Sequence, residues 1–230
     1  MAANKNKKPA NVSTAEKVAG VISKYRIVLI TIIALAVAGL ICLAVVNGIN
    51  SKQNKKDLEV IYTIEKELVE DAAGMSEAEL QAKYEKAIES LQPFTSKGGI
   101  VGARAEMLSA DVLLRQKKFE AARDSYVSAA KKAKGSYITG LCYFNAAVAC
   151  EELNDNEKAL EYYTLAANDK EFADPTHAWF SVGRIKEISL DYIGAKEAYD
   201  EIISRNNSDD PWFNYAKDRV LQMQIDGKIE

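Results

Sequence analysis

The segment YIGAKEAYDEI, residues 192–202, is the last of three copies of one pattern. The earlier copies are NEKALEYYTLA at 156–166 and FEAARDSYVSA at 119–129. In each copy a small residue stands four positions before a tyrosine, and it returns after 37 and then 36 positions. The pairs are Ala122 with Tyr126, Ala159 with Tyr163 and Ala195 with Tyr199. Three copies in one register indicate a helical repeat rather than a set of unrelated amphipathic helices.

A second small residue precedes each of these alanines by twelve positions, in the middle of the preceding predicted helix. These residues are Ala110, Ala147 and Gly183. The spacing resembles the tetratricopeptide repeat (TPR), in which small residues on two helices let the backbones approach and the aromatic residue fills the gap beside the next unit. The resemblance implies an all-α solenoid of helical hairpins. The intervals slightly exceed the usual ~34 residues, which predicts longer turns between repeats.

We expect this solenoid to occupy residues 50–230. Its predicted hairpins lie at about 51–92, 100–134, 137–169 and 176–205, where the first contains a degenerate copy around Tyr84 and Ala87. A last helix at 211–226 follows Asp209-Asp210-Pro211, which supplies an N-cap and a proline in the first helical turn. A terminal helix of this kind would cover the apolar face of the last repeat.

An uncharged apolar run, IVLITIIALAVAGLICLAVV, occupies residues 27–46. At ~1.5 Å per residue, about twenty such residues cross the ~30 Å hydrocarbon core of a bilayer. We therefore predict one membrane-spanning helix at 27–49, followed by a break at Asn47-Gly48-Ile49-Asn50. Two alternatives are a signal peptide cleaved near Ala36 or Ala38 and a lipoprotein cysteine at Cys42. The first would be cut inside the apolar run, and the second has bulky Ile41 where a small residue is needed.

Residues 1–26 form a basic tail before this run. The tail contains one acidic residue, Glu16, and six basic residues, which are Lys5, Lys7, Lys8, Lys17, Lys24 and Arg26. The positive-inside rule then predicts a cytoplasmic N-terminus and a solenoid outside the cytoplasm, although Lys52, Lys55 and Lys56 weaken the asymmetry. The first dozen residues are expected to be disordered. A capping box at Ser13 begins either an interfacial helix or an extension of the spanning helix.

Composition and motifs exclude several functions. From residue 27 onward 24 basic residues face 32 acidic ones, which argues against nucleic acid as a partner. Cys142 and Cys150 stand eight residues apart on one predicted helix, too far for a disulfide, so they are expected to be core residues. His177 is the only histidine, and no phosphate-binding loop, nucleophile motif or metal-ligand spacing occurs. We expect no catalytic residues, no metal and no cofactor.

The TPR resemblance implies where partners bind, because the first helix of each repeat lines the concave face of such arrays. The positions that match the groove are Arg104, Met107, Asp111 and Leu114, then Leu141, Phe144 and Val148, then His177, Phe180 and Arg184. Large apolar groups flanked by both charges suit short peptides or unfolded segments. The alternative is that the next repeat or the last helix buries Phe144 and Phe180.

The layout of the whole chain resembles the YfgM-like family, an ancillary subunit of the SecYEG translocon. The similarity includes Gly102-Ala103-Arg104-Ala105 and the ending Leu221-Gln222-Met223-Gln224-Ile225. It implies a non-enzymatic scaffold in the cell inner membrane, with a periplasmic solenoid whose partners are the translocon, periplasmic chaperones or client segments. The alternative is a structural single-pass protein whose solenoid self-associates or regulates another envelope complex.

Overall fold

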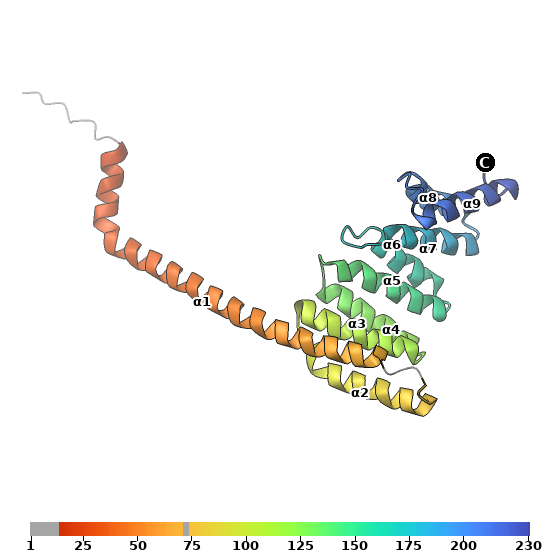
Figure 1. The fold of residues 1–230 in the computed structure, drawn as a ribbon. Helices are drawn as coiled ribbons and strands as arrows, with labels where there is room; N and C mark the ends of the chain where they lie inside the picture. The colour runs from red at the N-terminus through yellow and green to blue at the C-terminus, as the bar shows by residue number, and fades with distance from the viewer. Residues whose placement is uncertain (1–13, 71–73) are drawn as a thin grey trace, which may run out of the picture. The chain divides into compact units, whose positions relative to one another are not determined.

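The computed structural model describes residues 14–70 and 74–230, except the side chains of residues 14–23, 29 and 33. All regular elements in these residues are α-helices, so the expected all-α class is confirmed (Figure 1). The helices are α1 (Thr14–Glu70), α2 (Glu77–Thr95), α3 (Gly99–Arg115), α4 (Phe119–Lys132), α5 (Tyr137–Glu152), α6 (Asn156–Ala167), α7 (Pro175–Ile188), α8 (Tyr192–Ile203) and α9 (Pro211–Ile225).

The long helix α1 contains the apolar run. Among the described residues, one helix is long and apolar enough to cross a membrane by length and composition, and it is this one. The side chains of Ile27, Leu35 and Leu43 are 71%, 68% and 61% exposed, so the rest of the protein does not cover them. Lys5, Lys7, Lys8 and the capping residue Ser13 lie outside the described residues.

The predicted break at Asn47-Gly48-Ile49-Asn50 is wrong, because α1 continues through it to Glu70. Glycine costs a helix only about 1 kcal/mol and asparagine less. Nothing lies within 4 Å of where a side chain at Gly48 would begin, so no neighbouring group forces a turn there. The chain nevertheless divides into two compact units between Asn54 and Lys55. The last part of α1, from Lys55, therefore belongs to the solenoid.

The solenoid alternates two kinds of helix. We call residues 55–70 of α1, together with α3, α5, α7 and α9, the A helices, and α2, α4, α6 and α8 the B helices. Most contacts join helices that are adjacent in sequence, so the helices stack one after another (Figure 1). This is the TPR-like solenoid that the repeat pattern predicts.

Contacts between successive A helices show that these helices run parallel and in register. Phe144 of α5 contacts His177 of α7, and seven residues later in both helices Glu151 pairs with Arg184. The same holds one repeat on, where Phe180 contacts Trp212 and Glu187 pairs with Arg219. One edge of the solenoid therefore carries the beginnings of the A helices, and the opposite edge carries their ends.

The small residues of the repeat lie in the core as predicted. Ala122, Ala159 and Ala195 are fully buried, and so are Ala110 and Ala147 on the facing helices. At Gly183 an added side-chain carbon would lie 2.4 Å from the ring of Tyr199, so glycine is required for this tyrosine to fit. The repeat pattern thus indicates where the backbones of two helices approach each other and which aromatic ring fills the space beside them.

The turn from A helix to B helix is built in the same way in three repeats. Lys117, Asn154 and Leu190 each have a φ near +60°, at 58°, 58° and 62°. The following residue donates its backbone N–H to a carbonyl five positions back, as in the bond from Asp191 to Lys186. This is the Schellman arrangement, which satisfies the last carbonyls of the A helix.

Helix α9 ends the array, as predicted. The Asp210 side chain accepts a hydrogen bond from the backbone N–H of Trp212, and Pro211 occupies the first turn. Ala216 and Met223 face α8 and α7, whereas Lys217 and Asp218 are exposed. A polar outer face allows α9 to end the solenoid in water.

Candidate protein-binding face

The ten predicted groove residues all lie on the A helices α3, α5 and α7, but they differ in exposure. Met107 is buried, and Leu114 and Leu141 pack against the same core cluster, which also contains Tyr126 and Cys142. Val148 packs against the next cluster. These four side chains therefore stabilise the stack and offer little surface to a partner.

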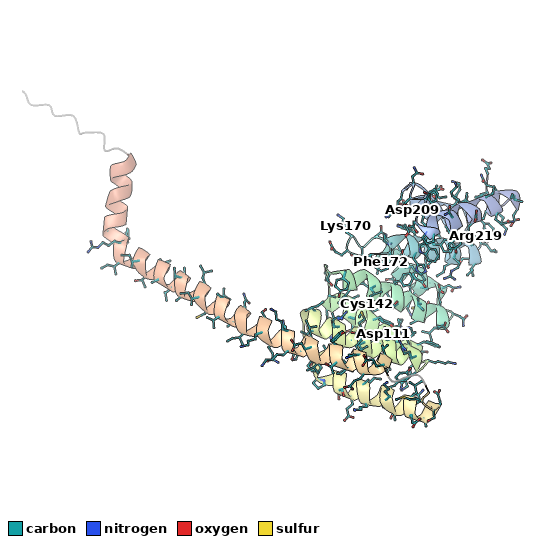
Figure 2. All side chains as sticks on the ribbon, viewed as in Figure 1. Asp111, Cys142, Lys170, Phe172, Asp209 and Arg219 are labelled. Atoms are coloured by element: carbon teal, nitrogen blue, oxygen red, sulfur yellow. The ribbon has the colours of Figure 1, made fainter. Side chains whose placement is uncertain are left out.

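Asp111 is directed into the protein rather than toward a ligand. Its Oδ1 atom accepts a hydrogen bond of 2.5 Å from the hydroxyl of Tyr126 on α4 (Figure 2 labels Asp111). Burial raises the pKa of this carboxyl above its ordinary value, while the bond from Tyr126 acts against that rise. Burial also raises the pKa of the Tyr126 hydroxyl, so the tyrosine remains the donor. Asp111 thus ties an A helix to its own B helix.

Arg104 lies at an open hollow between α1, α3 and the start of α5. Its guanidinium lies 3.6 Å from a carboxylate oxygen of Glu65 and 3.5 Å from the hydroxyl of Tyr137. The hollow is lined by Lys55, Leu58, Glu59, Tyr62, Ile100, Arg104 and Tyr137. Tyr62 and Tyr137 are 62% and 55% exposed, so this end of the A helices offers aromatic surface beside charges of both signs.

Nearer the C-terminus, the A helices carry a continuous row of rings, which we call the aromatic row: Phe144, His177, Trp212, Phe180 and Tyr215. The ring centroids of Phe144 and His177 are 4.6 Å apart, and those of His177 and Trp212 are 4.0 Å apart. Phe180 follows at 5.1 Å from Trp212, and Tyr215 lies 6.2 Å from Phe180. The row crosses three A helices, α5, α7 and α9.

Two of the five rings in this row were not among the predicted groove residues. Trp212 and Tyr215 belong to the last helix, which the sequence indicated only as a cap. Both follow a predicted residue by 35 positions, Trp212 after His177 and Tyr215 after Phe180. That interval was the available signal, and it shows that α9 continues the A-helix face as well as ending the solenoid.

The expected alternative, burial of the two phenylalanines, is realised in part. Phe144 also contacts the rings of Tyr163 and Phe172, the latter in the loop after α6 (Figure 2). Phe180 is half-buried beneath α9. Tyr215 is 54% exposed and gives the row its most open ring. The phenylalanines therefore form the floor of this surface, and the residues of α9 form its rim.

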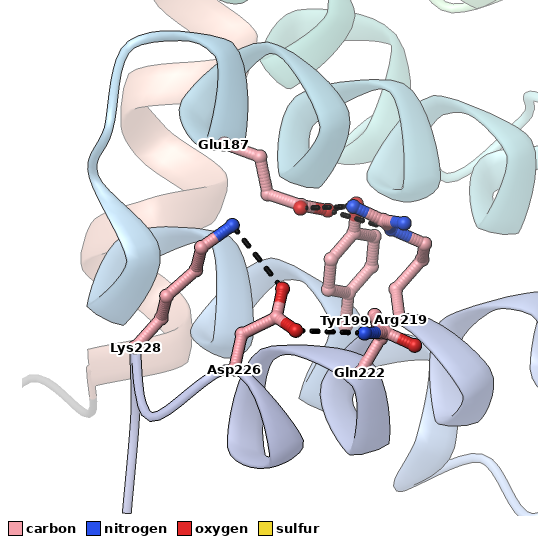
Figure 3. A network of polar contacts seen from close by, with 6 residues as sticks. All are labelled: Glu187, Tyr199, Arg219, Gln222, Asp226 and Lys228. Atoms are coloured by element: carbon pink, nitrogen blue, oxygen red, sulfur yellow. Dashed lines mark hydrogen bonds and ion pairs between the residues drawn. The ribbon is translucent and has the colours of Figure 1, made fainter.

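Arg184, the last predicted groove residue, pairs with Glu151 of the preceding A helix. The equivalent pair, Glu187 with Arg219, is drawn in Figure 3. There the Glu187 carboxylate accepts bonds from Nε of Arg219 at 3.0 Å and from the Tyr199 hydroxyl at 2.6 Å. The arginine holds the pKa of Glu187 below its ordinary value although burial opposes this. Each pair joins the ends of two neighbouring A helices.

The geometry offers little to a chemical reaction. Among the described residues no three His, Cys, Asp or Glu side chains are arranged to hold a metal. Burial raises the pKa of the thiols of Cys142 and Cys150 to about 12 and about 11, so neither is a ready nucleophile. Both cysteines are buried and unpaired, as predicted.

No protein-family model matches the chain. A TPR repeat-containing protein of Treponema pallidum (strain Nichols) is 29% identical over 160 residues, 68% of this chain and 66% of that protein. The match thus spans slightly less than two thirds of the relative. Together with the helical stack, this likeness supports a TPR protein and, through it, a scaffold for protein interaction.

Proposed function

We propose that the chain is a membrane-anchored scaffold that binds short or unfolded segments of other proteins along its A helices. The observation that carries the proposal is the aromatic row with its partly exposed rim at Trp212 and Tyr215. Aromatic side chains give large contact area at low entropic cost and dominate many protein interfaces. The pairs of Arg104 with Glu65, Arg184 with Glu151 and Arg219 with Glu187 place charges of both signs along the A helices, and these would orient a bound segment.

The anchor in this proposal is the apolar run of α1, at residues 27–49 in the cell inner membrane. The six basic residues before the run favour an N-terminus in the cytoplasm and a periplasmic solenoid. The resemblance to the YfgM-like family suggests the SecYEG translocon, periplasmic chaperones and client segments as partners. No nucleic acid, metal or cofactor has a role in this function.

Photo-crosslinking in native membranes tests the binding face. A photoreactive amino acid replaces Tyr215 in one variant and Leu165 in another, because Leu165 is 42% exposed on the B helix α6. We expect Tyr215 to crosslink to other proteins and Leu165 not to do so. Equal crosslinking at both positions would remove the support for the A-helix face, and crosslinks between two copies of the chain would favour the self-associating alternative.

The orientation is tested separately with reporters fused after Glu230. A reporter that is active only outside the cytoplasm should function there, and a cytoplasmic reporter should not. The opposite pattern would reverse the proposed topology. Replacing Lys5, Lys7, Lys8, Lys17 and Lys24 with Gln should give mixed orientations, because the basic flank is then lost.

A further inference from the structure

The turn between α7 and α8 differs from the two equivalent turns in one respect. Ile188, Leu190 and Ile193 are 58%, 70% and 71% exposed, although all three are large aliphatic residues within six positions. The equivalent residues after α5 are Glu152, Asn154 and Glu157, and those after α3 are Arg115, Lys117 and Glu120. Three polar positions have therefore become aliphatic in one repeat only. We call Ile188, Leu190 and Ile193 the aliphatic turn.

The backbone of this turn makes its composition more unusual. Leu190 has a φ of 62°, in the left-handed region that asparagine tolerates and bulky side chains disfavour. In the preceding repeat the same left-handed conformation is adopted by Asn154, and asparagine tolerates it. The fold therefore does not require leucine here, and a leucine in this conformation reduces stability while exposing apolar surface to water.

We propose that the aliphatic turn is a second docking surface, which binds a short uncharged aliphatic segment of a partner protein. The three side chains together expose a few hundred Å², which is comparable with the largest patch of a typical monomer, ~300–600 Å². A standard interface buries ~800 Å² on each partner. The turn is therefore too small for a stable dimer of this chain by itself and suits a transient contact with a short segment.

The surroundings set the chemistry of that segment. Lys186 and Asp191 flank the turn, but they pair with each other, with Nζ 3.5 Å from a carboxylate oxygen. Arg184, Glu187 and Arg219 line a hollow with Ile188, and their charges are also offset in ion pairs, with Glu151 and with each other, so the surface does not favour a charged ligand. The turn lies where the A helices end, the edge opposite Lys55, where the chain enters the solenoid. Surfaces that bind a bilayer combine apolar residues with Lys or Arg, and the lysine beside this turn is paired with Asp191, which favours a protein segment over a bilayer.

The preceding repeat provides a matched variant, because its turn folds with polar residues. In the full chain reconstituted in lipid nanodiscs, Ile188→Glu, Leu190→Asn and Ile193→Glu together copy the turn after α5. The probe is a fluorescent synthetic amphipathic helix with leucines at every third and fourth position, compared with the same peptide carrying serines. We expect the leucine peptide to bind the triple variant at least tenfold more weakly than the wild type, and the serine peptide to bind neither.

Two further variants make the test specific. Glu152→Ile, Asn154→Leu and Glu157→Ile together copy the aliphatic turn into the preceding repeat and should add a second site for the leucine peptide. Leu165→Ser, at an exposed position of the B helix α6, should leave this binding unchanged, which shows that an exposed leucine elsewhere does not suffice. Equal binding of the leucine peptide to wild type and triple variant overturns the proposal. So does a dimer in sedimentation velocity that the triple variant abolishes, because the occupant is then a second copy.

Discussion

The imidazole of His177 stacks on the indole of Trp212, with centroids 4.0 Å apart and planes 13° from parallel. Phe144 covers His177 from the other helix at 4.6 Å. Burial between these rings lowers the pKa of His177, and Arg184 lowers it further, whereas Asp174 partly offsets the change. The neutral imidazole is therefore the form that the folded chain favours.

Stability should depend on the protonation of His177. Because its pKa is lowered on folding, the unfolded chain binds a proton more readily once the pH falls below ~6.5. The stabilising effect is thus complete above that pH and is lost as the pH falls toward the lowered folded-state pKa. We expect the melting temperature to fall more between pH 7.5 and 5.5 in the wild type than in His177→Gln. An identical fall in both chains would show that His177 does not contribute.

The bond between Glu187 and Arg219 should hold α9 onto α7. Glu187 is only 10% exposed and also accepts the Tyr199 bond, so removing its charge leaves two donors less well satisfied. Arg219 is 45% exposed, which screens part of the attraction. We expect Glu187→Gln to cost about 1–2 kcal/mol in urea denaturation. A double-mutant cycle with Arg219→Gln measures the coupling, and additive costs would mean that the pair contributes nothing.

The buried alanines offer a test of the repeat register with a neighbour as control. Ala122 is fully buried against α3, whereas Ala121 beside it is exposed on the same helix. Ala122→Leu should cost about 1–3 kcal/mol through overpacking. Ala121→Leu should change stability by less than about 0.5 kcal/mol. Equal melting temperatures for the two variants would contradict the assigned core.

Phe144 and Tyr215 should have different roles: Phe144 should contribute to stability, and Tyr215 to the binding of partners. Phe144 is half-buried and contacts three other rings. We therefore expect Phe144→Ala to lower the free energy of unfolding by about 2–3 kcal/mol. Tyr215→Ser should leave thermal unfolding almost unchanged, because its ring is largely exposed. The second variant, but not a matched Leu165→Ser, should weaken capture of partners. Loss of the fold in Tyr215→Ser would reject its place on the rim.

Much of the solenoid could be predicted because its determinants are local. Ala195 and Tyr199 lie four residues apart on one helix, and Gly183 lies on the helix just before, so sequence spacing alone reports their packing. The continuation of α1 beyond the apolar run could not be predicted in this way. Asn47 and Gly48 have weak propensities, and helix on both sides outweighed them.

The candidate site was only partly visible in the sequence, because it depends on contacts between repeats. Residues 211–230 do not contain the paired signature that fixed the register elsewhere, so the sequence indicated only a cap at Trp212. The bond between Glu151 and Arg184 likewise joins residues 33 positions apart, and surface charges carry no spacing rule that would pair them. Local patterns thus gave the helices and the core, while the composition of the exposed face required the three-dimensional stack.

The stacking of each helix on its sequence neighbours also determines how the molecule would respond to tension. A force applied at Glu230 acts first on α9, whose packing against α8 and α7 is all that holds it. Once α9 detaches, the hairpin of α7 and α8 bears the load, and the hairpins nearer Lys55 keep their contacts. A chain held in a bilayer at one end and pulled at the other would therefore lengthen in hairpin-sized steps and recoil when the load is released.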